Sequence, residues 1–445
     1  MLQESTVQPL LGGAAPQAAS AAGSLGGGRG HTFRPKAPTT IKDTGLSDAV
    51  FESLVFKTLL AHGSLTSREV ARQTSLPGKP VIDMLASLKM RQLAHYKDSA
   101  AMGDFEYALT EAGRMRARRY MDECAYVGPA PVTLESYIES VEAQGIGTVQ
   151  PRQEDLERAF GDLLIDRKMF ERLGPAINSG RGLFLYGYPG NGKTSIAERI
   201  TDCFGDNVWI PYSIFTGGEL ITLFDPEIHD IVEHEVTPGS IPDPRWVLVR
   251  RPTIVVGGEL TMSSLDLCPN HETKITEASM QLKSNTGTLV IDDFGRQRMS
   301  PIELLNRWIV PLEKRYDFLA LANGKKIRVP FDQLIIFSTN LEPKDLVDEA
   351  FLRRIPYKIN VVDPSEAEFR QLFEIMAPKL RVDIEPGAVD YLIERHYKAV
   401  HRPFRCCQPR DLLMQIRNHA SYRGASAVAT PESFDLACDN YFAMM

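Results

Sequence analysis

The chain contains 445 residues, more than one compact core usually holds, so we expect two or three domains. Hydrophobic residues make up 43% and charged residues 24%, which excludes a chain that is disordered throughout, a collagen-like repeat and an integral membrane bundle. No apolar run approaches the roughly 20 residues that a bilayer span requires, and the first basic residue is Arg29. We therefore expect a soluble, cytoplasmic protein with no secretory signal and no membrane partner.

Charge and cysteine usage narrow the function further. Residues 1–150 contain 15 basic and 15 acidic residues, so the net charge of -7 falls on the rest of the chain. No segment is basic enough to predict nucleic-acid binding by itself. The six cysteines form no C-x-x-C pair, which favours reduced thiols over a disulfide or zinc framework. The adjacent Cys406 and Cys407 allow a redox role, but inert thiols are the simpler interpretation.

Residues 1–40 have low sequence complexity. Between residues 11 and 30 there are seven Gly and six Ala, with almost no large apolar side chains. Such a segment cannot bury enough surface to offset the entropy that ordering costs. We predict a disordered, Gly- and Ala-rich tail.

Residues 41–125 show helical periodicity. A first helix is predicted by side chains at the i, i+3, i+4 and i+7 positions, namely Phe51, Leu54, Val55 and Thr58. Thr66 and Glu69 have the spacing of a capping box, which predicts the start of a second helix. A third helix and two strands are expected at residues 80–93, 95–97 and 105–109, with Val81, Leu85 and Leu88 on one helix face. Three helices and a hairpin predict a winged helix-turn-helix domain.

The segment 105–114, Phe-Glu-Tyr-Ala-Leu-Thr-Glu-Ala-Gly-Arg, resembles the second wing strand and following helix of bacterial winged-helix regulators. The side chains available for DNA phosphates are Lys79, Lys89, Arg91, Arg114, Arg116, Arg118 and Arg119. However, residues 41–125 contain 12 basic and 11 acidic residues, so the domain is almost neutral. Nucleic-acid binding and protein docking both remain open for this domain.

Residues 126–150 begin with Gly-Pro-Ala-Pro at 128–131 and continue as a polar helical stretch, so we predict a linker. Beyond it, residues 183–186 form an apolar run of the buried-strand type. The pattern G-x-x-x-x-G-K-T follows at once, and a helical segment continues from it. The residues expected to bind nucleotide are Gly187, Tyr188, Pro189, Gly190, Asn191, Gly192, Lys193, Thr194 and Ser195.

The chemistry of this pattern is specific. Glycines allow the backbone N–H groups and the helix N-terminus to face phosphates. Lys193 then supplies a positive charge to the β- and γ-phosphates, and Thr194 is a ligand for Mg²⁺. A second apolar run at residues 288–291 ends in Asp292 and Asp293, at the edge of a parallel sheet where ligands bind. We expect Asp292 to hold Mg²⁺ through water and Asp293 to orient or deprotonate the attacking water.

At this point residues 150–445 resemble the AAA+ ATPases, because further motifs follow in that family's order. A third apolar strand at 334–339 precedes Asn340, which resembles the sensor 1 residue that senses the γ-phosphate. Arg353 and Arg354 resemble the arginine finger that completes the active site of an adjacent subunit. Residues 363–445 resemble the helical lid, in which Arg410 resembles the sensor 2 arginine, although Arg402 and Arg405 lie close enough in sequence to compete for that role.

Two features depart from the family pattern. The acidic pair is Asp-Asp rather than Asp-Glu, which puts the rate of hydrolysis in doubt more than nucleotide binding. The path from Gly187 to Asp292 is also longer than a strand, loop, helix and strand require. We interpret residues 209–268 as a β-rich insertion, in which the spacing of His229 and His234 does not favour a metal site.

The sequence therefore predicts an α/β P-loop core of the AAA+ type over 151–362, with a helical lid over 363–445 and an N-terminal winged helix. The resemblance implies an ATPase that requires ATP and Mg²⁺, forms a homo-oligomeric ring, with a hexamer as the expected form, and remodels a macromolecular partner. Protein is the first expectation for that partner, in a chaperone-like role. The alternative is an ATP-gated DNA-binding switch that acts through residues 41–125.

Overall fold

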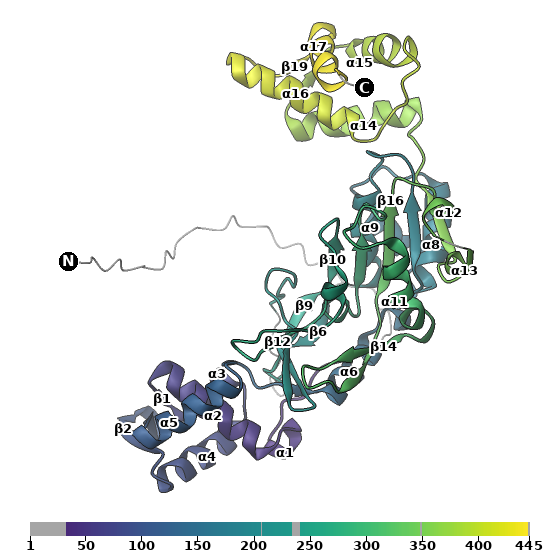
Figure 1. The fold of residues 1–445 in the computed structure, drawn as a ribbon. Coiled ribbons are helices and arrows are strands. Elements are labelled where there is room, and N and C mark those ends of the chain that lie inside the picture. The colour runs from purple at the N-terminus through teal and green to yellow at the C-terminus, as the bar shows by residue number, and fades with distance from the viewer. Residues whose placement is uncertain (1–32, 206, 234–240, 348, 444–445) are drawn as a thin grey trace, which may run out of the picture. The chain divides into compact units, whose positions relative to one another are not determined.

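The structure is a computed structural model that describes residues 33–205, 207–233, 241–347 and 349–443 (Figure 1). Most of the predicted tail lies outside these residues. Its last part, residues 33–40, is ordered, because the Phe33 ring packs against Trp246 at 5.6 Å and the Asp243 N–H donates to the Pro35 carbonyl. Within the described ranges, no helix combines the length and apolar character needed to cross a bilayer.

Residues 41–123 fold as helices around a three-stranded antiparallel sheet in the order β1-β3-β2. The predicted helix faces are buried, and the capping box between Thr66 and Glu69 is present. Strand β1 follows Gly63 directly and is too short to show a period in the sequence. The elements are α1 (Ile41–Thr44), α2 (Asp48–His62), β1 (Ser64–Thr66), α3 (Ser67–Thr74), α4 (Gly78–Met90), β2 (Ala94–Ala100), a 3-10 turn (Ala101–Gly103), β3 (Asp104–Leu109) and α5 (Glu111–Glu123).

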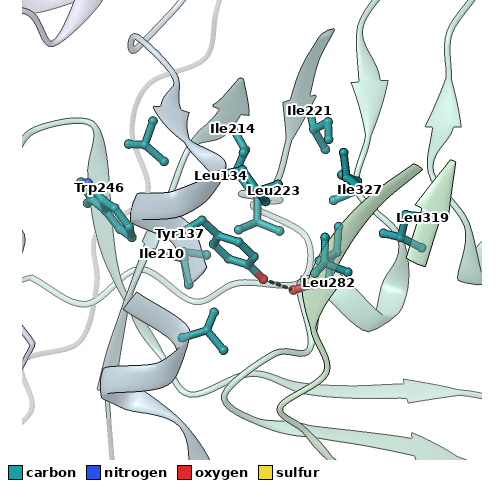
Figure 2. Packing of buried hydrophobic residues seen from close by; sticks show 14 of the residues in the cluster. Leu134, Tyr137, Ile210, Ile214, Ile221, Leu223, Trp246, Leu282, Leu319 and Ile327 are labelled. Atoms are coloured by element: carbon teal, nitrogen blue, oxygen red, sulfur yellow. Dashed lines mark hydrogen bonds between the residues drawn. The ribbon is translucent and has the colours of Figure 1, made fainter. Parts of the chain in front are cut away.

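The segment predicted as a linker, residues 126–150, is instead part of a hydrophobic core. It forms β4 (Val132–Thr133), α6 (Leu134–Gln144) and a 3-10 turn (Ile146–Thr148). Leu134, Tyr137 and Val141 are buried, and the Tyr137 hydroxyl donates to the Leu282 carbonyl at 3.4 Å (Figure 2). These side chains are spaced i, i+3 and i+7, so one face of an otherwise polar helix is apolar.

The same core is built mainly from β-structure. A five-stranded sheet has the order β11-β12-β8-β7-β4, and two antiparallel pairs, β6-β9 and β14-β15, contribute further side chains. The bounds are β6 (Asn207–Pro211), β7 (Ser213–Thr216), β8 (Glu219–Thr222), β9 (Trp246–Arg250), β11 (Cys268–Pro269), β12 (Thr276–Glu277), β14 (Tyr316–Ala320) and β15 (Lys326–Pro330). Strands therefore do occur in the predicted insertion, but this core also draws on segments before and after it.

The second core contains a five-stranded parallel sheet in the order β10-β13-β16-β5-β17. The strands are β5 (Leu183–Tyr186), β10 (Thr253–Val256), β13 (Thr288–Ile291), β16 (Leu334–Thr339) and β17 (Tyr357–Asn360). β10, assigned from sequence to the insertion, is instead an edge strand of this sheet. Its four apolar residues fit either location, since a short apolar run does not reveal its partner.

Helices cover both faces of the parallel sheet. Alternate residues of β5 point to opposite faces, so Leu183 and Leu185 pack with α7, α8 and α9, whereas Phe184 packs with α11. The helices and turns of this region are α7 (Gln153–Ala159), α8 (Arg167–Asn178), α9 (Lys193–Ile200), a 3-10 turn (Thr201–Phe204), a second one (Met262–Leu265), α10 (Met280–Lys283), α11 (Pro301–Lys314), α12 (Pro343–Leu346) and α13 (Glu349–Leu352). Burial on both faces explains why the strands read as continuous apolar runs.

Residues 366–441 are mainly helical, as predicted for the region after residue 363. They form α14 (Glu366–Leu380), α15 (Ala388–Leu392), a π-helical turn (Ile393–Lys398), α16 (Gln408–Arg423) and α17 (Pro431–Tyr441). A short parallel pair, β18 (Asp383–Ile384) and β19 (Val428–Ala429), joins the segments that follow α14 and α16. Phe369, Phe373 and Tyr397 lie in the centre of this separate core.

Candidate active site

The loop between β5 and α9 has the backbone that its glycines predict. Gly187, Gly190 and Gly192 have φ values of 140°, 84° and 82°, in the region that favours glycine. A Cβ at Gly187 would lie 2.4 Å from the Val361 carbonyl oxygen, so a larger residue does not fit there. Gly192 caps α9 without a side-chain hydrogen bond, and the first N–H groups of the helix are therefore open to an anion.

Lys193 is buried, with 7% of its surface exposed. Its ammonium donates to the carbonyls of Gly187 and Tyr188 at 3.0 and 2.9 Å and to the Asn340 Oδ1 at 2.7 Å. Burial lowers the pKa of Lys193, while the nearby Asp292 carboxylate opposes that shift. The lysine is therefore held on loop carbonyls at the centre of the site, and an incoming anion would favour its charged form.

Thr194 and Asp292 meet across the carboxyl edge of the sheet. The Thr194 hydroxyl on α9 donates to the Asp292 Oδ2 at the end of β13, with 2.9 Å between the oxygens. Hydroxyl and carboxylate oxygens are the donors that Mg²⁺ prefers, and it commonly completes its shell with water and substrate phosphates. Among the described residues, no group of three His, Cys, Asp or Glu side chains is placed to hold a metal ion alone. The pair thus fits a Mg²⁺ ion that is shared with a bound phosphate chain.

Asn340 joins the lysine to the second carboxylate. It follows β16, accepts from Lys193 through Oδ1, and donates from Nδ2 to the Asp293 Oδ1 at 3.0 Å. Asp293 is exposed and has a φ of 47°, a left-handed conformation that Asp tolerates better than most residues. One amide side chain therefore contacts both the candidate phosphate-binding lysine and the candidate base.

Gln297 was not identified from the sequence, yet it holds the acidic turn in place. Its Nε2 donates to the carbonyls of Asp292 and Asp293 at 2.9 and 3.2 Å, and its Oε1 accepts from the Gly295 N–H at 2.8 Å. These contacts bridge the residues on both sides of the left-handed Asp293. No sequence pattern predicts that a glutamine will form hydrogen bonds with the turn that precedes it.

The lid segment before α16 contacts the glycine-rich loop. The Cys407 N–H donates to the Gly190 carbonyl at 2.8 Å, and the Arg405 guanidinium lies 4.3 Å from the centre of the exposed Tyr188 ring. Arg405 is also paired with Asp363, which follows β17 and accepts from the Asn191 amide at 2.7 Å. The segment before α16 is therefore joined to the glycine-rich loop by a backbone hydrogen bond, by a cationic arginine and by the carboxylate with which that arginine pairs.

Arg410, the residue predicted for the sensor 2 role, lies at the start of α16 and pairs with its neighbour Asp411 at 3.0 Å. Its side chain is 55% exposed. Arg405 is therefore the arginine of this region that the structure brings to the loop, whereas the partner of Arg410 within the described residues is Asp411. Asp363 carried a usable signal, because it follows a predicted strand just as Asp292 and Asn340 do.

Arg353 and Arg354 lie before β17, at the amino edge of the sheet and away from the glycine-rich loop. Both line a cavity of about 700 Å³. Arg353 is exposed, whereas Arg354 is half-buried and pairs through Nε with the Glu313 carboxylate at 2.7 Å. His229, whose spacing from His234 did not favour a metal site, is buried, and its ring is bonded to the Asp225 N–H and the Lys283 carbonyl. His234 lies outside the described residues.

Comparisons with known proteins give a family match for the lid region only. Residues 365–440 match a family described as Domain of unknown function (DUF8689). A comparison with curated protein sequences gives no match. Among solved structures, NtrX from Brucella abortus is 13% identical over 64% of this chain and 58% of its own, less than two thirds of its length, with a TM-score of 0.40. Two variants of RuvB from Thermotoga maritima are 13% and 12% identical, cover 68% and 63% of this chain and 74% and 71% of their own, and have TM-scores of 0.35 and 0.36.

Proposed function

We propose that this protein is an AAA+ ATPase that binds ATP with Mg²⁺ at the glycine-rich loop and hydrolyses it. One observation carries the proposal: Lys193, Asn340 and Asp293 form a single hydrogen-bonded chain beside the paired Thr194 and Asp292. This set lies at the carboxyl ends of β5, β13 and β16, where parallel sheets bind ligands. The site therefore brings together a cation that can bind phosphate, a pair of side chains that can hold a metal ion, and a candidate base.

Each residue has a defined role in the proposed reaction. The loop N–H groups and Lys193 bind the phosphates, and Lys193 exchanges its loop carbonyls for phosphate oxygens. Thr194 and Asp292 would hold Mg²⁺, which when bound would neutralise charge on the phosphate oxygens. Asp293 orients or deprotonates the attacking water, while Asn340 positions that carboxylate. Because aspartate is one methylene shorter than the family's usual glutamate, we expect slow turnover with ordinary ATP affinity.

The proposed site is completed by a second copy of the chain. Charge that develops on the transferred phosphoryl group must be met by a cation, which an adjacent subunit can supply. Arg353 is the better candidate of the arginine pair, since it is exposed while Arg354 is held by Glu313. This role requires a ring, and a hexamer is the form that the resemblance implies. Arg405, in place of or with Arg410, is the candidate for the lid arginine that contacts the bound nucleotide.

We further propose that the ATP cycle remodels a protein partner. Several basic side chains of residues 41–123 that the sequence offers for DNA phosphates are already paired. Arg91 and Arg116 share Glu52 at 2.6 and 2.7 Å, and Arg114 pairs with Glu111 at 2.7 Å. Lys89 lies over the Tyr96 ring at 3.4 Å. These contacts reduce the charge available for a phosphate backbone and favour protein as the partner.

A DNA-binding switch is the second candidate function, in which hydrolysis resets DNA affinity. Exposed Lys79 on α4 and exposed Arg118 and Arg119 on α5 are the observations that favour it. Salt-sensitive DNA binding that changes with ATP would support this switch, and its absence with and without ATP would exclude it.

ATP turnover measured against protein concentration tests the main proposal. If the active site is shared between copies, turnover per subunit falls as the oligomer dissociates. Constant turnover down to a confirmed monomer would rule out the shared site.

The protein partner can be captured with Asp293→Asn, a variant that should bind ATP without hydrolysing it. Capture from lysate with this variant, compared with Lys193→Ala as the nucleotide-free control, should enrich the remodelled protein.

A further inference from the structure

The cavity at the amino edge of the parallel sheet contains more positive than negative side chains. Arg181, Arg315, Arg353 and Arg354 line it, together with the carboxylates of Glu313 and Asp332. Both carboxylates are engaged: Glu313 by Arg354 at 2.7 Å and Asp332 by Arg315 at 3.2 Å. The cavity therefore has two cations beyond those that its own carboxylates neutralise.

Those two cations are Arg181 and Arg353. Within the part of the chain that the structure describes, neither guanidinium has an ion pair, a side-chain hydrogen bond or a ring contact, and both residues are exposed. They come from different elements, since Arg181 precedes β5 and Arg353 precedes β17, and these strands are neighbours in the sheet. Two guanidinium groups that line one cavity suit a ligand with several anionic oxygens, and phosphate is the usual one.

The phosphate cannot come from a nucleotide bound by the same copy. Arg181 and Gly187 lie at opposite ends of β5, six residues apart. An extended strand rises about 3.3 Å per residue, so about 20 Å separates them along the sheet. Each copy therefore presents a phosphate-binding loop at one edge and a cationic cavity at the other. Two different faces of this kind meet in a head-to-tail contact between copies.

We propose that Arg181 is a second cation supplied in trans, which acts with Arg353 on the γ-phosphate of the nucleotide bound to a second copy. This assignment rests on the proposed ATPase function and adds a residue to it. It also gives the cavity a ligand class: the terminal phosphate of a nucleoside triphosphate. Arg315 and Arg354 also line the cavity, and their pairing with Asp332 and Glu313 holds the side chains of its walls in place.

The test is a subunit-mixing experiment with the full-length chain. Arg181→Ala should bind a fluorescent ATP analogue within about twofold of wild type, while its turnover falls at least about tenfold. Lys193→Ala has an intact cavity but no working loop, and it is also inactive alone. A mixture of the two should recover turnover, because the working loops of Arg181→Ala then lie against intact cavities of Lys193→Ala. In an equal, random mixture about half of those loops have such a neighbour.

The controls separate this inference from the ATPase proposal. Arg172→Ala removes an exposed arginine of α8 that does not line the cavity, and its turnover should match wild type. Wild-type turnover in Arg181→Ala, or inactivity without recovery on mixing, would overturn the role of Arg181. If the wild type hydrolyses no ATP, the ATPase proposal fails instead. In that case ATP-dependent assembly, measured by analytical ultracentrifugation, tests the cavity. If Arg181→Ala assembles with ATP as the wild type does, the proposed role of Arg181 is refuted. Loss of DNA binding with normal turnover would likewise refute it in favour of a nucleic-acid backbone.

Discussion

The two edges of the parallel sheet differ in chemistry because the strands all run in one direction. At the carboxyl edge the chain enters α9 after Gly192, so uncapped N–H groups and carboxylates gather there. At the amino edge α8 and α11 end, and their last carbonyls carry partial negative charge. Arginines are favoured at such helix ends: Arg315 follows α11 directly, and Arg181 follows α8 after Ser179 and Gly180. Parallel topology thus favours anions at the carboxyl edge and cations at the amino edge.

This difference has a consequence for assembly. When two opposite edges of a molecule differ in chemistry, one edge of a copy can bind the other edge of the next copy, head to tail. A two-fold dimer instead pairs identical surfaces. The active site would then be formed from the carboxyl edge of one copy and the amino edge of the next. Substitutions at the two edges should therefore affect different steps: nucleotide binding at the carboxyl edge and turnover at the amino edge.

The largest effect is expected at the carboxyl edge. Lys193→Ala removes the ammonium that bonds two loop carbonyls and Asn340, and we expect ATP affinity to fall at least about 100-fold. Titration of a fluorescent ATP analogue measures the loss, with circular dichroism as a check on folding. Binding within tenfold of wild type would mean that the loop lysine is not the main phosphate contact.

The amino edge should affect turnover without affecting binding. Arg353→Ala should reduce kcat about 100- to 1,000-fold at unchanged ATP affinity. Arg354→Ala should reduce kcat less, because this guanidinium is already paired with Glu313, but it should lower stability through the carboxylate left without that partner.

Steady-state kinetics and thermal melting of the two variants separate these effects. Glu313→Gln serves as the matched control, since it weakens the same pair without removing either arginine. If Arg354→Ala proves the more damaging to kcat, the assignment of Arg353 as the contact in trans is wrong. If both variants hydrolyse ATP normally, the head-to-tail site is wrong.

An intermediate effect is expected where the lid meets the carboxyl edge. Arg405 contacts Tyr188 and pairs with Asp363, whereas Arg410, among the residues that the structure describes, pairs with its neighbour Asp411. We expect Arg405→Ala to lower ATP affinity about tenfold and Arg410→Ala to change it less than twofold. Isothermal titration calorimetry on both variants distinguishes them. The reverse order would restore Arg410 as the lid arginine and would imply that the lid moves when nucleotide binds.

The sequence was most informative where the chemistry is local. The glycine-rich loop is framed by a strand and a helix that are its immediate neighbours, and the strands that present Asp292 and Asn340 are unbroken apolar runs. The choice between Arg405 and Arg410 is different, because five residues separate them and only tertiary packing decides which one reaches the loop. Gln297 is likewise defined by a turn that the sequence does not show.

The missed core around Tyr137 has another cause. The i, i+3, i+7 spacing of Leu134, Tyr137 and Val141 was present, but the Gly-Pro-Ala-Pro run before it indicated a linker. Its apolar face is covered by strands that lie more than 60 residues further along the chain. A single apolar face does not reveal its partner, so the helix was predicted and its role was not.

The smallest expected effect tests how the amino edge is fixed to this core. Asn285 donates to the Tyr137 hydroxyl at 2.8 Å, and its Oδ1 accepts from the N–H of Asp332, the carboxylate that holds Arg315. Tyr137→Phe keeps the buried ring and removes the hydroxyl, so the free energy of unfolding should fall by about 1 kcal/mol. Urea denaturation followed by tryptophan fluorescence measures this, since Trp209 and Trp246 lie in the same core. ATP turnover should stay unchanged, because Asn285 still donates to the Pro330 carbonyl at 3.0 Å and keeps Asp332 in place. A fall in turnover without loss of stability would show instead that the hydroxyl sets the position of the amino-edge arginines.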